Sequence, residues 1–175
     1  MTAVPATALQ LLAETTDVRP GGAVLAGVTA GLIFLVIVWD AIAGGVTRMG
    51  YLYVVGAGVA PRSSRSTAYA LGLAAHTVLS AVYGLAYAAL IRAFGASAID
   101  EAAGLGLLIG LVHGAVALIV AGWLLDRIHP LVRSGRLPKP GRALTGYGRN
   151  TPIVWMIAHA VFGLAVGAVY AASTF

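Results

Sequence analysis

The chain has 175 residues, of which 59% are hydrophobic and only 10% are charged, and its mean hydropathy is +0.91. Soluble domains average about 45–50% apolar and about 25% charged residues, so this composition argues against a water-soluble fold and predicts an integral membrane protein. The absence of cysteine excludes a disulfide scaffold, an iron–sulfur protein, a thiolate zinc site and a cysteine nucleophile.

The first twenty residues do not resemble a secretory signal. Such a signal has a basic leader before its apolar core, whereas the first charged residue here is Glu14. We expect this segment to be a short outer one that is partly helical between Ala6 and Glu14.

Four stretches of about 20 apolar residues follow, each long enough to cross a bilayer. In chain order they are Ala23–Ala43, Ala68–Ile91, Ala103–Leu125 and Ile153–Ala172. They predict an all-α integral membrane four-helix bundle, in which residues 1–175 form a single transmembrane domain. An even number of spans places both termini on the same side.

Basic residues are concentrated in the loops that join span one to span two and span three to span four. These loops, residues 44–67 and 126–152, hold nine of the eleven Lys and Arg residues. Cytoplasmic loops are enriched in Lys and Arg, so we expect a plasma (inner) membrane protein with both loops in the cytoplasm and both termini outside. Trp39, Trp123 and Trp155 fall at the cytoplasmic span ends, as an interfacial aromatic belt requires.

Each loop has a feature of its own. In the first, residues 50–60 are apolar but too short to span, which predicts an interfacial or re-entrant piece with Tyr51 and Tyr53 at headgroup level. The second contains four prolines and should lack long regular structure, and His129 in it should be a solvent-facing end-cap. Six basic side chains either set the topology or dock on lipid headgroups or a partner: Arg62, Arg65, Arg133, Arg136, Lys139 and Arg142.

Spans two and four share a pattern at an offset of 83 residues. AHTVLSAVYGLAYAA begins at Ala75 and AHAVFGLAVGAVYAA begins at Ala158, which aligns His76 with His159. Because both spans run in the same direction, the pattern predicts two parallel related helical hairpins. Small residues also recur at a spacing of four, and close backbone approach through such residues packs helices in lipid. The expected helix-packing positions are Gly27, Gly31, Ser80, Gly84, Gly106, Gly110, Gly114, Gly163 and Gly167.

Three histidines and one aspartate lie inside the spans: Asp40, His76, His113 and His159. Each histidine falls on a helix-packing face, and an intramembrane ionisable group is a candidate functional site. Four interpretations remain open. They are structural hydrogen bonds between helices, a zinc or copper site of three imidazoles with Asp40 as a fourth ligand, a haem held by His76 and His159, and a proton or ion path through Asp40.

The histidine followed by small residues and tyrosine in spans two and four resembles small four-span bacterial and archaeal membrane proteins that have no assigned activity. The loop before the last span shares the likeness, with His129-Pro130 followed by Pro140-Gly141. The resemblance covers spans two to four. It implies the fold and does not imply a reaction.

The chain lacks a P-loop, a dinucleotide fingerprint, a nucleophile elbow and HExxH. We therefore expect a non-enzymatic interaction or accessory protein, acting as a homo-oligomer or as a subunit of a larger membrane complex. The alternative is a redox or transport protein whose histidines hold a metal or haem, and a third possibility is a small proton or ion channel or transporter. We expect no cofactor, with haem, zinc or copper under the alternative. The expected partners are the lipid bilayer and other membrane subunits or copies of this chain, and no nucleic acid.

Overall fold

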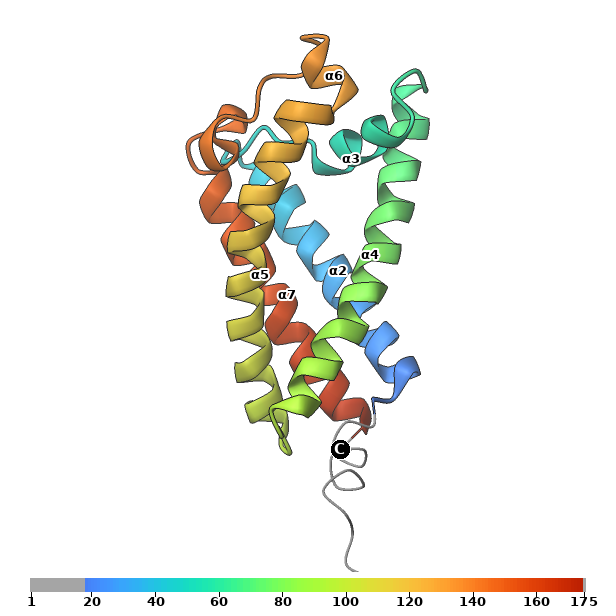
Figure 1. Cartoon of the computed structure of the whole chain (residues 1–175), viewed down its shortest axis with the longest axis vertical. Coiled ribbons are helices and arrows are strands. Elements are labelled where there is room, and N and C mark those ends of the chain that lie inside the picture. The colour runs from blue at the N-terminus through green and yellow to red at the C-terminus, as the bar shows by residue number, and fades with distance from the viewer. Residues whose placement is uncertain (1–17, 175) are drawn as a thin grey trace, which may run out of the picture.

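Four long helices form the body of the protein (Figure 1). The computed structural model describes residues 18–174, and within them every regular element is helical. The long helices are α2 (Pro20–Ala43), α4 (Arg65–Ala93), α5 (Ile99–Ile128) and α7 (Thr151–Thr174). Each is long and apolar enough to cross a membrane. The prediction of an all-α, multi-pass membrane protein is therefore confirmed, whereas the helix expected between Ala6 and Glu14 lies outside the described residues.

The helices extend beyond the predicted apolar stretches at almost every end, because local capping chemistry decides where a helix begins. Pro20 occupies the start of α2, where its fixed φ suits the first turn and its missing N–H is not needed. Ser64 caps α4 by accepting a hydrogen bond from the backbone N–H of Thr67 at 3.1 Å. Asp100 and Glu101 lie in the first turn of α5, where negative charge complements the helix dipole.

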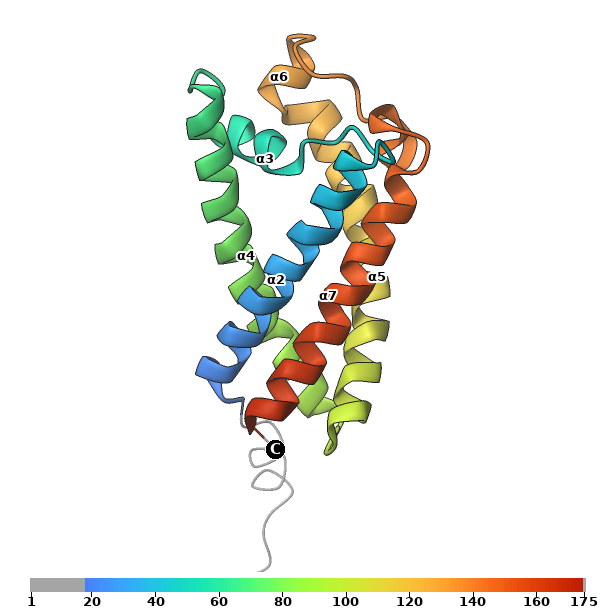
Figure 2. The ribbon, with the colours of Figure 1, turned by 180° about the vertical axis from the view of Figure 1, so that it is seen from behind.

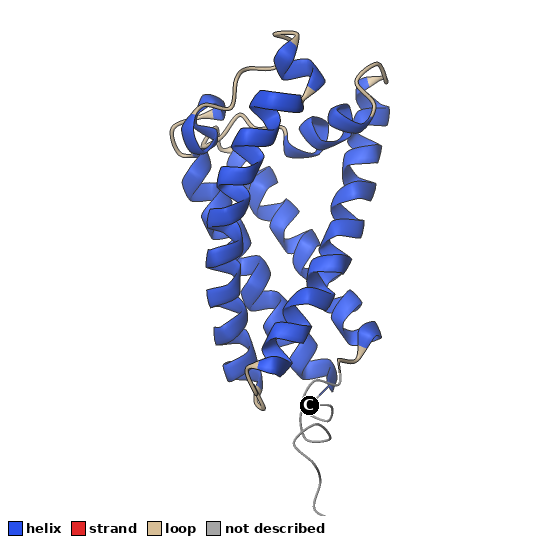
Figure 3. Cartoon of the chain, viewed as in Figure 1, coloured by secondary structure: helices blue, strands red, loops and turns tan. Residues whose placement is uncertain are grey.

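Helices α2 and α5 run in one direction and α4 and α7 in the other (Figure 1 and Figure 2). Both connecting segments consequently lie at one end of the bundle, here called the loop end. The short helices α3 (Tyr51–Val59), α6 (Pro130–Arg133) and η1 (Arg142–Tyr147) gather there, joined by irregular chain (Figure 3). Extensive contacts join α5 to α7, α7 to α2 and α2 to α4, whereas α4 and α5 scarcely touch. The bundle is therefore loosely closed on the side between α4 and α5.

Small residues create the two tightest helix contacts. Between α2 and α4, a Cβ added at Gly84 would collide with the backbone of Ala23 and Gly27. Between α5 and α7, a Cβ at Gly167 would collide with the backbone of Ala102 and lie 2.9 Å from the Cα of Ala103. Backbone atoms cannot rotate away, so these contacts tolerate no side chain, as expected for helices that associate in lipid by close approach.

The other small residues continue the same two contacts. On the α2–α4 side, Gly31 faces Ser80 and the Nε2 of His76. On the α5–α7 side, Gly106 and Gly110 face the backbone of Gly163. Further along, a Cβ at Gly114 would lie 2.8 Å from the Cβ of His159. All nine of the small residues singled out in the sequence thus lie at contacts inside this one chain.

Helix α3 lies at the loop end against the start of α4 (Figure 1). Its close packing uses glycine on both sides, because Gly56 faces the backbone of Ala68 and Gly72 faces that of Leu52. Tyr51 was expected at headgroup level, but its side chain points into the bundle, where its hydroxyl lies 3.1 Å from Nδ1 of His76. The sequence predicted that this segment lies near the membrane surface, but it did not predict the direction of the Tyr51 side chain.

His129 corrects a second expectation. It is only 6% exposed, and its Nε2 donates a hydrogen bond to the carbonyl of Val54 in α3 at 2.9 Å. The predicted solvent-facing end-cap is wrong, because α3 folds over the end of α5 and covers the ring. The rest of this loop does lack long regular structure, since its helices α6 and η1 have four and six residues.

Candidate functional site

Phe34 of α2 lies at the centre of a cluster of rings inside the bundle. Its ring centroid is 5.0 Å from that of His159, 5.4 Å from His76, 5.6 Å from Tyr51 and 6.0 Å from Trp155. Phe34 is 4% exposed. The cluster therefore draws on α2, α3, α4 and α7, and it brings His76 and His159 into contact with the same phenyl ring.

His76 is fully hydrogen-bonded. Its Nε2 lies 3.0 Å from the carbonyl oxygen of Gly31, and its Nδ1 lies 3.1 Å from the hydroxyl of Tyr51. A carbonyl can only accept, so Nε2 carries the proton and Nδ1 accepts from the tyrosine. This neutral imidazole satisfies a buried carbonyl and a buried hydroxyl, as a structural histidine between helices does. Nε2 of His76 also lies 3.4 Å from Ser80 Oγ. Because Nε2 carries its proton toward Gly31, it cannot act as a base that activates this serine.

His159 is only half satisfied. Its Nδ1 lies 2.9 Å from the backbone carbonyl of Trp155, one turn earlier on α7. Nδ1 therefore donates, which leaves Nε2 of the neutral ring as an acceptor. No described residue donates a hydrogen bond to that nitrogen. The site thus presents one imidazole acceptor with no partner.

His113 of α5 completes the histidine set. Its ring lies 4.9 Å from that of His159, edge to face, and 4.2 Å from that of Tyr83. Its Nδ1 pairs with the hydroxyl of Tyr87 at 3.0 Å, and its Nε2 has no hydrogen-bond partner among the described residues. The structure therefore brings His113 and His159 together directly, while His159 and His76 share Phe34 as a common neighbour.

A cavity of about 460 Å³ adjoins these rings. It lies on the loosely closed side of the bundle, with one wall from α4 and the other from α5. Val116 and Val120 of α5 line it and are 54% and 44% exposed, so its mouth opens toward the bilayer. Trp155 also lines it, and its buried indole Nε1 has no acceptor among the described residues.

The geometry does not fit a haem between His76 and His159. Phe34 packs against both imidazole rings, and both nitrogens of His76 already have partners. A porphyrin ligated by both histidines would have to displace this phenyl ring from its contacts and take one of those nitrogens. For a metal ion, residues 18–174 contain no group of three or more His, Asp or Glu that could hold one.

Asp40 lies apart from the histidines. It is exposed near the end of α2, it does not line the cavity, and its carboxylate makes no hydrogen bond or ion pair with a described residue. A ligand set or proton path that joins Asp40 to the three histidines has no contact to support it here.

The six basic side chains proposed for headgroup or partner docking are all exposed at or beside the loop-end segments: Arg62, Arg65, Arg133, Arg136, Lys139 and Arg142.

Sequence reasoning missed Phe34, Tyr51 and Trp155 as members of the site. One signal could have found Phe34. If Gly27 and Gly31 are aligned with Gly106 and Gly110, which make equivalent contacts, Phe34 falls at the position of His113. Tyr51 carries no comparable signal, because only the fold of the first loop returns it to α4.

No family model, curated protein or solved structure matches this chain.

Proposed function

We propose that this chain is a non-enzymatic membrane protein that binds a small lipid-soluble ring compound with a hydroxyl group, of the phenol or hydroquinone class. The observation that carries the proposal is the unpartnered acceptor Nε2 of His159 beside the apolar cavity. His159 is only 6% exposed, and a ligand hydroxyl that reaches this nitrogen from the cavity and donates to it would complete the hydrogen bonding of the ring. The indole N–H of Trp155 lacks a partner as well and could donate to the same ligand.

The size and lining of the cavity support this ligand class. Its volume of about 460 Å³ falls in the range of roughly 300–1,000 Å³ of small-molecule sites, which are mostly apolar with a few polar groups. Rings of Phe34, Tyr83 and Trp155 line it, and aromatic rings prefer edge-to-face or offset contacts with one another. Entry between α4 and α5 suits a ligand dissolved in the bilayer.

We further propose that the membrane is the plasma (inner) membrane, with the loop end in the cytoplasm. This orientation is supported by the positive-inside rule, since the segments at the loop end carry nine of the eleven Lys and Arg residues.

We also interpret the two hairpins α2–α4 and α5–α7 as related repeats. In support, Ala23 and Gly27 contact α4 as Ala102 and Gly106 contact α7.

The role as an accessory subunit or homo-oligomer stays a prediction. That prediction was based on the abundance of small residues, which can pack helices of different chains as well as helices of one chain. Contacts inside this chain account for all nine of the small residues that were singled out. The outward faces carry large apolar side chains instead, such as Leu108, Val112 and Ile119 at 60%, 66% and 73% exposure. Lipid alone can cover such faces.

Ligand binding can be followed by the fluorescence of Trp155. The exposed Trp39 and Trp123 are replaced by phenylalanine, and the variant in nanodiscs is titrated with a short-chain alkyl hydroquinone and with its dimethyl ether. We expect saturable quenching by the hydroquinone and roughly 5- to 150-fold weaker binding of the ether, because a lost hydrogen bond to a buried group costs about 1–3 kcal/mol.

The same titration with His159→Phe separates the proposal from its competitors. This change keeps a ring and removes the acceptor, so it should abolish the preference for the hydroquinone over its ether. Equal binding of both compounds to the unchanged protein, or no saturable quenching, would refute the proposal. Stoichiometric zinc or copper that is lost in both His113→Phe and His159→Phe would favour a metal protein in its place.

A further inference from the structure

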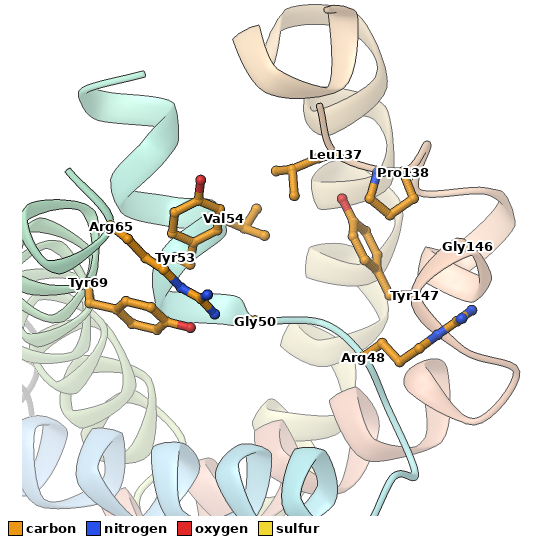
Figure 4. A pocket seen from close by; sticks show the side chains of 10 residues that line it. All are labelled: Arg48, Gly50, Tyr53, Val54, Arg65, Tyr69, Leu137, Pro138, Gly146 and Tyr147. Atoms are coloured by element: carbon orange, nitrogen blue, oxygen red, sulfur yellow. The ribbon is translucent and has the colours of Figure 1, made fainter. Parts of the chain in front are cut away.

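A second hollow, of about 470 Å³, lies at the loop end and is separate in its lining from the histidine cavity. Figure 4 shows it between α3 and the start of α4 on one side and the segment around η1 on the other. Three tyrosines and two arginines line it, with no carboxylate among the lining residues: Tyr53, Tyr69, Tyr147, Arg48 and Arg65. The hollow is therefore positively charged and rich in hydroxyl groups.

Arg65 is held at the edge of this hollow by aromatic rings. Its guanidinium carbon lies 5.9 Å from the ring centroid of Tyr53 and 5.8 Å from that of Tyr69. Cation–π contacts of this kind fix the guanidinium while leaving its N–H groups able to donate. Figure 4 shows the guanidinium extending into the hollow, and no described carboxylate pairs with it. Arg65 is thus a positioned cation with donors to spare.

Tyr147 provides an independent observation on the opposite wall. It is 2% exposed, and its buried hydroxyl has no hydrogen-bond partner among the described residues. Burial also raises the pKa of this phenol, so it stays a neutral donor near neutral pH. A buried hydroxyl without a partner is costly unless a ligand or water completes it. Tyr147 lies on the opposite side of the hollow from Arg65, with its hydroxyl beside Leu137 and Pro138 (Figure 4).

We propose that this hollow binds a phosphate group, either of a phospholipid headgroup or of a soluble phosphate compound. Donors are present on two different elements, with Arg65 and Tyr69 on α4 and Tyr147 on η1, which suits the several oxygens of a tetrahedral phosphate, whereas the guanidinium of Arg48 extends away from the hollow (Figure 4). Arginine also favours this anion through its fork of N–H groups. The position at the loop end of the spanning helices places the hollow where headgroups lie.

The test uses the full chain in a detergent that contains no phosphate. It is titrated with dihexanoyl-phosphatidic acid below its micelle concentration, with inorganic phosphate and with dihexanoyl-glycerol, and binding is followed by phosphorus NMR line broadening and by the shift in melting temperature. We expect phosphatidic acid to bind saturably and dihexanoyl-glycerol neither to bind nor to compete. Equal competition by inorganic phosphate would uphold the site with a soluble ligand as its source.

Matched variants make the result specific. Arg65→Gln removes the positioned cation, whereas Arg62→Gln removes another exposed charge three residues earlier that does not line the hollow. We expect Arg65→Gln to weaken binding by about tenfold or more, because hydrogen bonds to charged groups are the strong ones, and Arg62→Gln to leave it unchanged. Tyr147→Phe, which removes one oxygen atom, should also weaken binding and covers the case in which Arg65→Gln does not fold. Equal losses in the Arg62 and Arg65 variants, or no binding of either phosphate compound, would overturn the proposal.

Discussion

Substitution of Gly163 by alanine should separate α5 from α7. A Cβ at this position would collide with the carbonyl of Gly106 and lie 2.9 Å from both the carbonyl carbon of Gly106 and the Cα of Gly110. Carbon atoms in favourable contact lie about 3.5–4.0 Å apart, so the two helices would have to move apart by about 1 Å. All the obstructing atoms belong to the backbone, and no side chain can rotate to make room.

The expected loss of stability follows from this separation. A gap of about 0.5–1 Å already forfeits roughly a quarter to a half of each dispersion contact, and overpacking of this kind costs typically about 1–3 kcal/mol. Gly104→Ala on α5 is the matched control, because a Cβ there would meet nothing within 4 Å. That change should be neutral or stabilise by about 0.4–1 kcal/mol, since alanine restricts the unfolded backbone.

Reversible unfolding in mixed micelles measures both variants. The free energy of unfolding is followed by tryptophan fluorescence, in which the buried Trp155 of α7 reports directly on this interface. We expect Gly163→Ala to unfold at lower denaturant and Gly104→Ala at the same or higher denaturant. If the two variants differ by less than about 0.5 kcal/mol, which is the usual effect of a surface substitution, the close contact between α5 and α7 does not stabilise the fold and the reasoning is refuted.

Three further predictions concern individual side chains and the topology. His76→Phe should lower the free energy of unfolding by about 0.5–1.5 kcal/mol more than His113→Phe. Both changes unpair a tyrosine hydroxyl, but only His76→Phe also removes a hydrogen bond to the carbonyl of Gly31; equal losses in denaturant unfolding would contradict the assignment of His76 as the structural histidine. Burial raises the pKa of Tyr147, so the unfolded chain ionises this phenol first and stability should fall above about pH 10, the ordinary pKa of tyrosine. Unfolding measured against pH should show a shallower fall in Tyr147→Phe, and an identical slope would refute this. The natural chain has no cysteine, so a membrane-impermeant maleimide should label Ser97→Cys in intact cells and Ser134→Cys only after permeabilisation; the reverse pattern would invert the orientation.

The sequence alone was sufficient to predict the four spans. Hydropathy is a local property, and a run of about 20 apolar residues can satisfy its backbone in lipid only as a helix. The same locality explains the errors at the boundaries, where Ser64 and Pro20 extend helices past their apolar stretches by capping chemistry that hydropathy does not measure.

The histidine site could be predicted only in part. The sequence singled out His76, His113 and His159 because ionisable groups in a span are rare, but it could not say which of their nitrogens have partners. That outcome depends on Gly31 and Tyr51, which lie 45 and 25 residues from His76. His129 was missed for the same reason, since the carbonyl that it contacts lies 75 residues earlier in the chain.

What the sequence determined by itself is the class of protein, the number of spans and the small-residue positions at which helices can approach. Each of these is a property of one residue or of one continuous segment. Only the tertiary structure decided that Phe34 contacts two of the histidines, that His159 keeps an acceptor without a partner, and that α4 and α5 leave a cavity between them. These features arise where separate helices meet, and the geometry of such meetings is fixed by packing across the whole bundle rather than by any one segment.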